Sequence, residues 1–256
     1  MIREILQDEW DELKKFVEKD IARNYFILLG LWSNKKVYDR VYGEFKDDYL
    51  KAVLFRRNSG VLQFYSPGEF DVDGFVNLIS TLEYDGLIGA RSYCDKFLDK
   101  GIFSFVKDGA YIARLDTSYN MGKLQNEFNI RNVGINDLDE IVKLYKSIFK
   151  SFSPKEVMVE KLITNRGRGV CIEKNGEIIS VAQTDFEMED GAIIVGVATK
   201  SNHRCKGLAT ACVARLIELL QKEGKNLFLQ YDNLDAGKIY ERLGFERLDQ
   251  VMHYKR

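Results

Sequence analysis

The sequence has few of the residues that build a metal site or a disulfide framework. Its 256 residues include only two histidines, His203 and His253, which offer no ligand cluster. The four cysteines stand far apart and form no C-x-x-C pair: Cys94, Cys171, Cys205 and Cys212. We therefore expect reduced thiols and no metal.

The sequence also lacks a long apolar run and an excess of charge of either sign. Its best apolar run, Tyr25 to Trp32, is far shorter than the ~20 residues of a membrane-spanning helix, and acidic residues interrupt the first segment. With 38 basic and 39 acidic residues, the net charge of −1 creates no general attraction for nucleic acid or an anionic membrane. We expect a soluble, cytoplasmic protein with no nucleic-acid or membrane partner, in which any anion site is local.

The length and composition indicate two globular domains. Apolar residues make up 45% of the chain and charged residues 30%, which is typical of proteins that bury an ordinary core. A chain of 256 residues accommodates two domains of common size. Apolar periodicity is lost from Asp116 to Gln125, so we expect a linker there and domains at 1–125 and 126–256.

The first half mixes helical and strand-like segments. Apolar spacing predicts helices at Ile2–Lys19, Asn24–Trp32 and Val72–Leu82. Short β-branched or aromatic runs predict strands at Val37–Tyr42, Lys51–Phe55, Val61–Tyr65 and Leu87–Ala90. Two further strands, Phe103–Val106 and Tyr111–Leu115, are expected around a turn at Asp108-Gly109.

The second half alternates strands and helices more regularly. Strands are expected at Phe128–Asn132, Val170–Glu173, Ile178–Phe186, Ala192–Thr199, Asn226–Tyr231 and Phe245–Tyr254, with a hairpin turn at Asn175-Gly176. Helices are expected after Asn136 or Asp137, after Ser153-Pro154, and at Gly207–Lys222 and Asp235–Leu243.

A local anion site is predicted where the strand at 192–199 meets the helix that follows. The first N–H groups of a helix lack internal partners, and the helix dipole adds about half a positive charge there. Glycine lets a ligand approach the backbone, and nearby basic side chains add charge, so the segment suits a pyrophosphate. No Walker sequence and no G-x-G-x-x-G opens a helix in this chain. The candidate binding residues are Val197, Ala198, Thr199, Arg204, Cys205, Lys206, Gly207, Leu208, Ala209 and Thr210.

The pattern V-A-T-x-x-x-x-R-x-x-G-x-A, from Val197 to Ala209, resembles the acetyl-CoA loop of the Gcn5-related N-acetyltransferase (GNAT) superfamily. A second block, Asn233 to Phe245, resembles the N-x-x-A-x-x-x-Y-x-x-x-G-F region of that superfamily. The resemblance covers about half of the chain. It implies an α/β (α+β, three-layer) fold, a mixed twisted sheet with helices on both faces, and acetyl-CoA as cosubstrate.

The same resemblance assigns roles to two side chains. It implies that Asn233 helps to hold the pantetheine arm and that Tyr240 protonates the departing thiolate. Each residue also has a purely structural interpretation, Asn233 as a helix N-cap and Tyr240 as a packing aromatic. A purely structural interpretation also exists for Arg204, Lys206 and Gly207, which would then be only a charged helix start.

Acyl transfer to an amine needs two further groups. The Val197 N–H group is a candidate to stabilise the oxygen on which negative charge develops. The proton of the amine needs an acceptor, and the carboxylates at 185–190 are candidates, directly or through water. Among Asp185, Glu187, Glu189 and Asp190 we favour Glu187 as this base. The alternative is that these residues form a solvated acidic turn.

The first half lacks an R-x-x-G-x-A loop, so we do not expect it to bind CoA. The stretch Cys94 to Phe103 faintly echoes Tyr240 to Phe245, which favours a degenerate GNAT-like copy, although a chance match explains it equally. Superfamily members with two domains pair such a copy with an active one. By that analogy the first half would wall the acceptor pocket or mediate a homodimer.

These observations predict an N-acetyltransferase that moves an acetyl group from acetyl-CoA to a small-molecule amine. Three alternatives stay open: another acyl-CoA as donor, a protein lysine as acceptor, or an acyl-CoA sensor that does not catalyse transfer.

Overall fold

The chain folds into two compact units in a computed structural model that describes residues 1–33, 36–116, 118 and 128–256. The first unit comprises Met1–Ile112 and Leu248–Arg256, and the second comprises Ala113–Arg247. The division falls within two long strands, β6 (Phe105–Leu115) and β12 (Phe245–Lys255). The linker expected at 116–125 lies outside the described residues, except for Asp116 and Ser118.

The assignment of the last residues differs from the domain limits expected from the sequence. Residues 248–256 were expected in the second domain, but they belong to the first unit. The reason is backbone pairing, because Val251–Lys255 of β12 align antiparallel with Gly86–Ala90 of β5.

The first unit is a mixed sheet whose strands follow the order β1-β2-β3-β4-β5-β12. Neighbouring strands are antiparallel except β4 and β5, which are parallel. Its strands before β6 are β1 (Ile2–Glu4), β2 (Tyr38–Lys46), β3 (Tyr49–Arg57), β4 (Val61–Tyr65) and β5 (Gly86–Ala90). Its helices are α1 (Trp10–Glu18), α2 (Tyr25–Leu31), α3 (Val72–Ser80) and α4 (Arg91–Cys94), with 3-10 turns at Gln7–Glu9 and Asp95–Lys100.

Helices cover both faces of this sheet, as two successive residues of β4 show. The Phe64 ring packs edge-on against Phe75 of α3 at 5.0 Å. Its neighbour Tyr65 packs against Phe16 of α1 at 5.1 Å. Successive strand residues point to opposite faces, so α1 and α3 lie on opposite sides of β4. These four aromatic side chains are almost fully buried.

Two local expectations for the first unit are wrong. Residues 2–4 form β1 rather than the start of a helix, because they pair with Tyr42–Glu44 of β2. Residues 105–115 form one strand, β6, with no turn at Asp108-Gly109. Gly109 instead permits close packing, since a Cβ atom there would lie 2.7 Å from the carbonyl oxygen of Val251.

The second unit is also a mixed sheet, with the order β11-β10-β9-β8-β7. Neighbouring strands are antiparallel except β10 and β11, which are parallel. Its strands are β7 (Ile130–Asn132), β8 (Gly169–Lys174), β9 (Glu177–Asp185), β10 (Gly191–Thr199) and β11 (Asn226–Tyr231). Its helices are α5 (Leu138–Lys146), α6 (Lys155–Ile163), α7 (Leu208–Lys222) and α8 (Leu234–Arg242), with 3-10 turns at Ile135–Asp137 and Ser201–His203.

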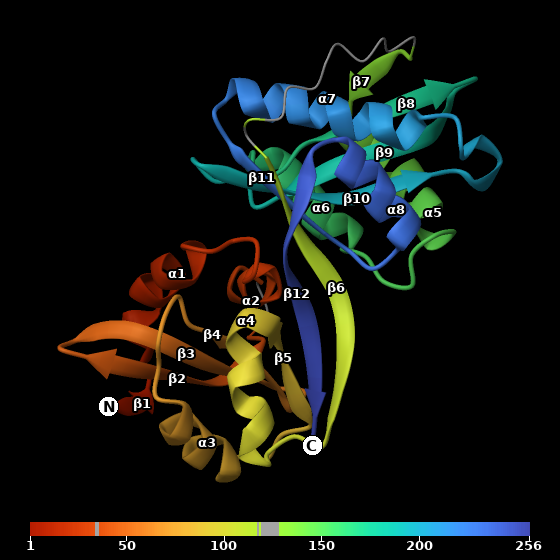
Figure 1. Cartoon of the computed structure of the whole chain (residues 1–256). Helices are drawn as coiled ribbons and strands as arrows, with labels where there is room; N and C mark the ends of the chain where they lie inside the picture. The colour runs from red at the N-terminus through yellow and green to blue at the C-terminus, as the bar shows by residue number, and fades with distance from the viewer. Residues whose placement is uncertain (34–35, 117, 119–127) are drawn as a thin grey trace. The chain divides into compact units, whose positions relative to one another are not determined.

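Helices cover both faces of this sheet too, which confirms the expected architecture (Figure 1). On β9, Ser180 faces α7, where its hydroxyl lies 3.8 Å from the thiol of Cys212. The next residue, Val181, belongs to the core formed with Ile141 of α5 and Met158 of α6. The sheet is thus held between α7 on one face and α5 with α6 on the other.

The two units repeat the same plan. In the first unit Arg3 pairs with Gly43, and Gly43 pairs with Val53. In the second unit Arg131 pairs with Cys171, and Cys171 pairs with Val181. Each residue of the second set lies 128 positions after its counterpart, as 131 is from 3. Both units also follow the order strand, two helices, three strands, helix, strand.

Candidate functional site

A cavity opens in the second unit where β10 and β11 separate. The two strands align in parallel only over Gly191–Ile194 and Asn226–Leu229. Beyond these residues, the end of β10 and the end of β11 with the two residues that follow it line a cavity of about 1270 Å³, with Val195–Thr199 on one side and Gln230–Asn233 on the other. Two strands that diverge inside a sheet expose backbone groups to whatever enters between them.

A β-bulge shapes the β10 wall of this cavity. On β9, Val181 and Gln183 align with Ala198 and Val195, so one residue of β9 faces two of β10. The two residues of the bulge, Gly196 and Val197, have no register partner on β9 or on β11. Gly196 has a left-handed φ of 60°, and both residues line the cavity. The bulge therefore turns backbone that would otherwise pair with β9 toward the cavity.

The loop from β10 to α7 ends the cavity with an uncapped helix. Gly207, the N-cap of α7, has a φ of 79°, and no side chain caps the first turn. By contrast, Asp71 caps α3, and its carboxylate accepts a hydrogen bond from the Gly74 N–H group. The first N–H groups of the 15-residue α7 are left without a side-chain acceptor, which suits an anion.

Basic side chains stand at the same end of the cavity. His203 and Arg204 both line it, and Arg204 Nε donates to the carbonyl oxygen of Thr199 at 3.2 Å. That bond fixes the Arg204 stem to the end of β10 while the guanidinium keeps four further donor hydrogens. Lys206 does not line the cavity, and its Nζ donates to the carbonyl oxygen of Asn202 at 3.2 Å.

Almost all sequence-predicted binding residues meet at this cavity. Apart from Lys206, the structure brings together the expected residues of β10, the loop, α7 and α8: Val197, Ala198, Thr199, Arg204, Cys205, Gly207, Leu208, Ala209, Thr210, Asn233 and Tyr240. Segments that the sequence separates by some 40 residues thus share one cleft, although their roles in binding stay predictions.

Asn233 and Tyr240 occupy the α8 side of the cavity. The Asn233 side chain caps α8 by accepting from the N–H group of Asp235 at 2.9 Å, so its interpretation as an N-cap is confirmed. Tyr240 is 7% exposed, and its ring lies 5.5 Å from that of Tyr231. Burial raises the pKa of Tyr240 to about 12, so its phenol is protonated at neutral pH.

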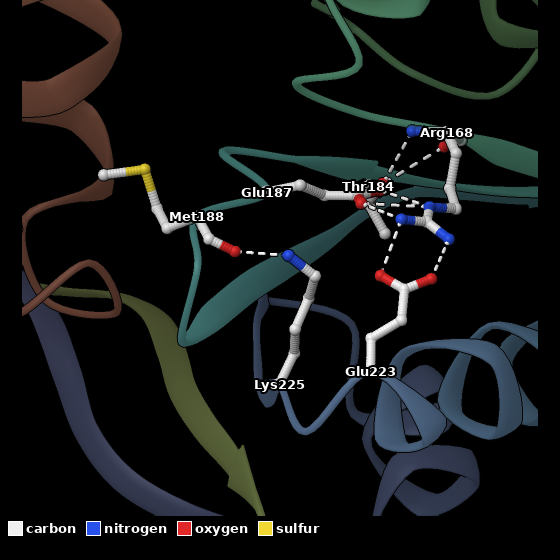
Figure 2. Close-up of polar contacts among 6 residues, drawn as sticks. All are labelled: Arg168, Thr184, Glu187, Met188, Glu223 and Lys225. Carbon is white, nitrogen blue, oxygen red and sulfur yellow. Dashed lines mark hydrogen bonds and ion pairs between the residues drawn. The ribbon is translucent and has the colours of Figure 1, made fainter.

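Glu187 does not line the cavity. It belongs to a polar network with Arg168, Thr184 and Glu223 (Figure 2). Its carboxylate pairs with Arg168 at 2.6 Å and also accepts from the Thr184 hydroxyl. Arg168 in turn pairs with Glu223, the C-cap of α7, at 2.9 Å. The Glu187 side chain is 2% exposed, and its partners occupy the oxygens that a base would offer to an amine. Its assignment as the base stays a prediction that this geometry does not favour.

The other carboxylates of this turn are also absent from the cavity lining. Asp185 pairs with Lys161 of α6 at 2.8 Å, and its side chain is 5% exposed. Glu189 and Asp190 are exposed. The acidic turn is therefore partly buried in ion pairs and partly solvated, rather than uniformly solvated.

Sequence reasoning missed several residues that shape the cavity. Phe128, Ile148 and Phe149 line it, and Tyr145 of α5 supports the bulge from behind. A usable signal was Gly196 within the apolar run Ala192–Ala198, since an isolated glycine in a strand indicates a bulge or a close backbone approach. The aromatic residues carried no comparable signal, because their spacing fits an ordinary core.

Neither a cluster of metal-ligating side chains nor a membrane-spanning helix occurs in the described part of the chain. Within it, no group of three or more His, Cys, Asp or Glu side chains could hold a metal ion. No described helix is both long enough and apolar enough to cross a membrane.

Comparison with family models gives a direct match. The model described as GNAT acetyltransferase matches residues 101–254, which is more than half of the chain. The chain belongs to the GNAT acetyltransferase family. The cleft between β10 and β11, with its bulge and uncapped helix, is thus the candidate site of a GNAT protein.

Two relatives of this GNAT chain carry N-acetyltransferase names. An uncharacterized N-acetyltransferase of Methanocaldococcus jannaschii is 27% identical over an alignment of 148 positions, and the match covers 50% of this chain and 65% of that protein. An N-alpha-acetyltransferase of Sulfurisphaera tokodaii is 22% identical over 147 residues, 52% of this chain and 88% of that protein. The chain thus spans less than two thirds of the first relative.

Solved GNAT structures share the fold of the whole chain. An acetyltransferase from Colwellia psychrerythraea superposes with a TM-score of 0.72 and 14% identity. The alignment covers 100% of this chain and 99% of the Colwellia chain. A tandem GNAT protein from the clavulanic acid biosynthesis pathway has a TM-score of 0.66 and 11% identity, covering 100% and 98%. At these identities the likeness concerns the fold alone, and it extends to both units.

Proposed function

We propose that the protein is an N-acetyltransferase that moves an acetyl group from acetyl-CoA to an amine. The observation that carries the proposal is the cleft of the second unit, which joins an uncapped helix start, exposed strand backbone and a protonated phenol in one cavity. Acetyl-CoA has a pyrophosphate, an amide-rich pantetheine arm and a thioester, in that order. The cleft offers a matching group for each part.

The two ends of the cleft suit different parts of acetyl-CoA. The uncapped start of α7, with Arg204 beside it, suits the pyrophosphate, because N–H groups and a guanidinium both donate to phosphate oxygens. The pantetheine amides would bind along Val195–Ala198 of β10 as an added strand. The thioester then lies near the bulge and Tyr240.

The chemistry is direct attack. The lone pair of a neutral amine attacks the thioester carbonyl carbon, and the Val197 N–H group donates to the oxygen that becomes negative. When the carbon–sulfur bond breaks, the sulfur takes a proton from the Tyr240 phenol, whose raised pKa keeps it protonated until then. The amine passes its extra proton to water rather than to the carboxylates at 185–190, which do not line the cavity. That proton restores the phenol, and the products are an N-acetylated amine and free CoA.

We propose a small-molecule amine as the acceptor. A second candidate is the α-amino group of a protein, because one relative is named an N-alpha-acetyltransferase. A third is binding without turnover, as in an acyl-CoA sensor. A cell extract treated with the enzyme and labelled acetyl-CoA separates them, because the label enters small molecules, proteins or neither.

The decisive experiment is calorimetric titration with acetyl-CoA. We expect micromolar binding by the wild-type chain and a loss of at least about tenfold in affinity for Arg204→Glu, which places an acid beside the pyrophosphate. Arg215→Glu is the matched control, since it makes the same charge change on α7 outside the cavity lining. Absence of binding by the wild-type chain, or equal losses in the two variants, would refute the assignment of the site.

A further inference from the structure

The bulge of β10 is held by a tyrosine that lies outside the cavity lining. Tyr145, on α5, donates its hydroxyl hydrogen to the carbonyl oxygen of Gly196 at 2.8 Å. The same hydroxyl lies 3.2 Å from Oε1 of Gln183 on β9. A phenol has one hydrogen to donate, and the shorter distance assigns it to Gly196.

Tyr145 is positioned to keep this bond. Its side chain is 2% exposed, and its ring packs edge-on against Phe149 at 5.2 Å and Phe152 at 5.5 Å. Burial, followed by the charge of Asp185, raises its pKa, so the hydroxyl stays a donor throughout the neutral and mildly alkaline range.

Gly196 is fitted to the tyrosine in two ways. Its φ of 60° is a conformation that residues with a Cβ atom rarely adopt. A Cβ atom at this position would also collide with the Tyr145 hydroxyl group. Each of these two features alone favours glycine at position 196. Together they show that the backbone of the bulge and the Tyr145 hydroxyl are packed closely against each other.

Peptide geometry links this bond to the neighbouring N–H group. The carbonyl of Gly196 and the N–H of Val197 belong to one planar trans peptide, in which they point in opposite directions. A donor that fixes the Gly196 oxygen therefore also fixes the direction of the Val197 N–H group, away from Tyr145. Val197 lines the cavity and has no register partner on either neighbouring strand.

We propose that Tyr145 is a positioning residue, which directs the Val197 N–H group at the thioester oxygen by holding the carbonyl of Gly196. The inference rests on the proposed function, because it needs a thioester in the cleft. Tyr145 touches no reacting atom in this role. Without the Tyr145 hydroxyl, the peptide between Gly196 and Val197 is free to rotate. The Val197 N–H group then no longer points at the thioester oxygen.

Infrared spectroscopy of bound acetyl-CoA, labelled with carbon-13 at the thioester carbonyl, reads this hydrogen bond and needs no acceptor. We expect the carbonyl band of acetyl-CoA bound to the wild-type chain to lie at lower frequency than that of free acetyl-CoA with the same label. In Tyr145→Phe, which keeps the ring, the band should return toward the free value, while the calorimetric Kd for acetyl-CoA changes less than about threefold.

Tyr38→Phe is the matched control. Tyr38 is equally buried, in the first unit, and its hydroxyl likewise contacts one main-chain carbonyl, of Ile27 at 3.1 Å, and one glutamine, Gln63 at 2.7 Å. We expect this variant to keep the shifted band. If Tyr145→Phe fails to fold, Gly196→Ala provides the second test, since its Cβ must displace the same peptide and abolish the shift.

The outcomes separate the two proposals. A wild-type chain that does not bind acetyl-CoA refutes the proposed function. Binding without a shifted band leaves the proposed function standing and overturns the role of Tyr145. A shift that survives in Tyr145→Phe, or in Gly196→Ala where Tyr145→Phe does not fold, does the same. Loss of the shift in Tyr38→Phe as well would overturn it too, by making the effect a general consequence of lost stability.

Discussion

The carboxylate of Asp249 lies 2.6 Å from Nε of Arg23, although 226 positions separate the two residues in the sequence. The Asp249 side chain is 6% exposed, and it also accepts from the hydroxyl of Ser92 at 2.6 Å. All three residues belong to the first unit. The pair therefore fastens the C-terminal strand to the unit that the N-terminus begins.

Replacing Asp249 by alanine should destabilise the first unit. The change leaves the half-buried Arg23 guanidinium with one carboxylate partner instead of two, and we expect a loss of about 2–3 kcal/mol in the free energy of unfolding. Urea unfolding followed by circular dichroism measures it. Asp108→Ala is the control, because its pair with Arg91 is exposed and contributes roughly 0.5 kcal/mol. Equal effects of the two changes would contradict the prediction.

Glu9 should make stability depend on pH in the acid range. Hydrogen bonds from Arg3 and from the Leu6 N–H group lower the pKa of Glu9 to about 2. A depressed pKa stabilises the fold above the ordinary value of 4.5, and this contribution disappears as pH falls from 4.5 to about 2. Glu9→Gln should therefore be less stable than wild type at pH 7 but not at pH 2, as measured by thermal unfolding. Glu12→Gln, at an exposed position, should show no such convergence.

Asn233 allows its two roles to be separated. Asn233→Ala removes the N-cap of α8 and should cost about 1 kcal/mol of stability. Asn233→Asp keeps a capping oxygen but removes the amide N–H donors. If the side chain also holds pantetheine, Asn233→Asp should bind acetyl-CoA more weakly at wild-type stability. Unchanged binding in calorimetry would leave Asn233 with the cap as its only role.

Tyr240→Phe should slow acetyl transfer by about 10²-fold, because a general acid contributes at least that much. Acetyl-CoA affinity should stay close to that of wild type, since the ring remains. With a pKa of about 12, the phenol should stay active up to about pH 11, so no alkaline loss of rate near pH 10 is expected from Tyr240. Equal rates for the variant and wild type would exclude Tyr240 as the acid.

Glu187→Gln decides between a base and a structural ion pair. As the base, Glu187 would produce the acidic limb of the pH–rate profile, and its amide would remove that limb and lower the rate at neutral pH. As a partner of Arg168 alone, it should affect stability and leave the profile in place. The geometry favours the second result. The measurement is the rate of acetyl transfer from pH 5 to 9, beside thermal unfolding.

Local sequence signals predicted the elements that local interactions determine. Asn175-Gly176 is the two-residue turn between β8 and β9, where both residues have positive φ values of 54° and 79°. The expected helix at Gly207–Lys222 corresponds to α7, with Gly207 as its N-cap. The motif likewise predicted residues that line the cavity, because strand end, loop and helix start are contiguous in the sequence. Their role in binding an anion stays a prediction.

Features that depend on distant pairing could not be read in this way. The sequence does not identify Ile2–Glu4 as a strand, because the strand with which this segment pairs lies about 40 residues further on. The partner of Tyr145 is Gly196, and no periodicity links a helix residue to a bulge two strands away. The sequence favours Glu187 as a base because it gives no sign that this carboxylate is buried opposite Arg168.

The pairing of β12 with β5 sets an order for biogenesis. As the chain leaves the ribosome, residues 86–90 emerge long before residues 251–255 that complete their side of the sheet. Until then β5 is an open edge, a surface that invites pairing with other chains. By contrast, all residues of the second unit, Ala113–Arg247, have been synthesised before residues 251–255. The first unit therefore completes its sheet only after residues 251–255 have been synthesised.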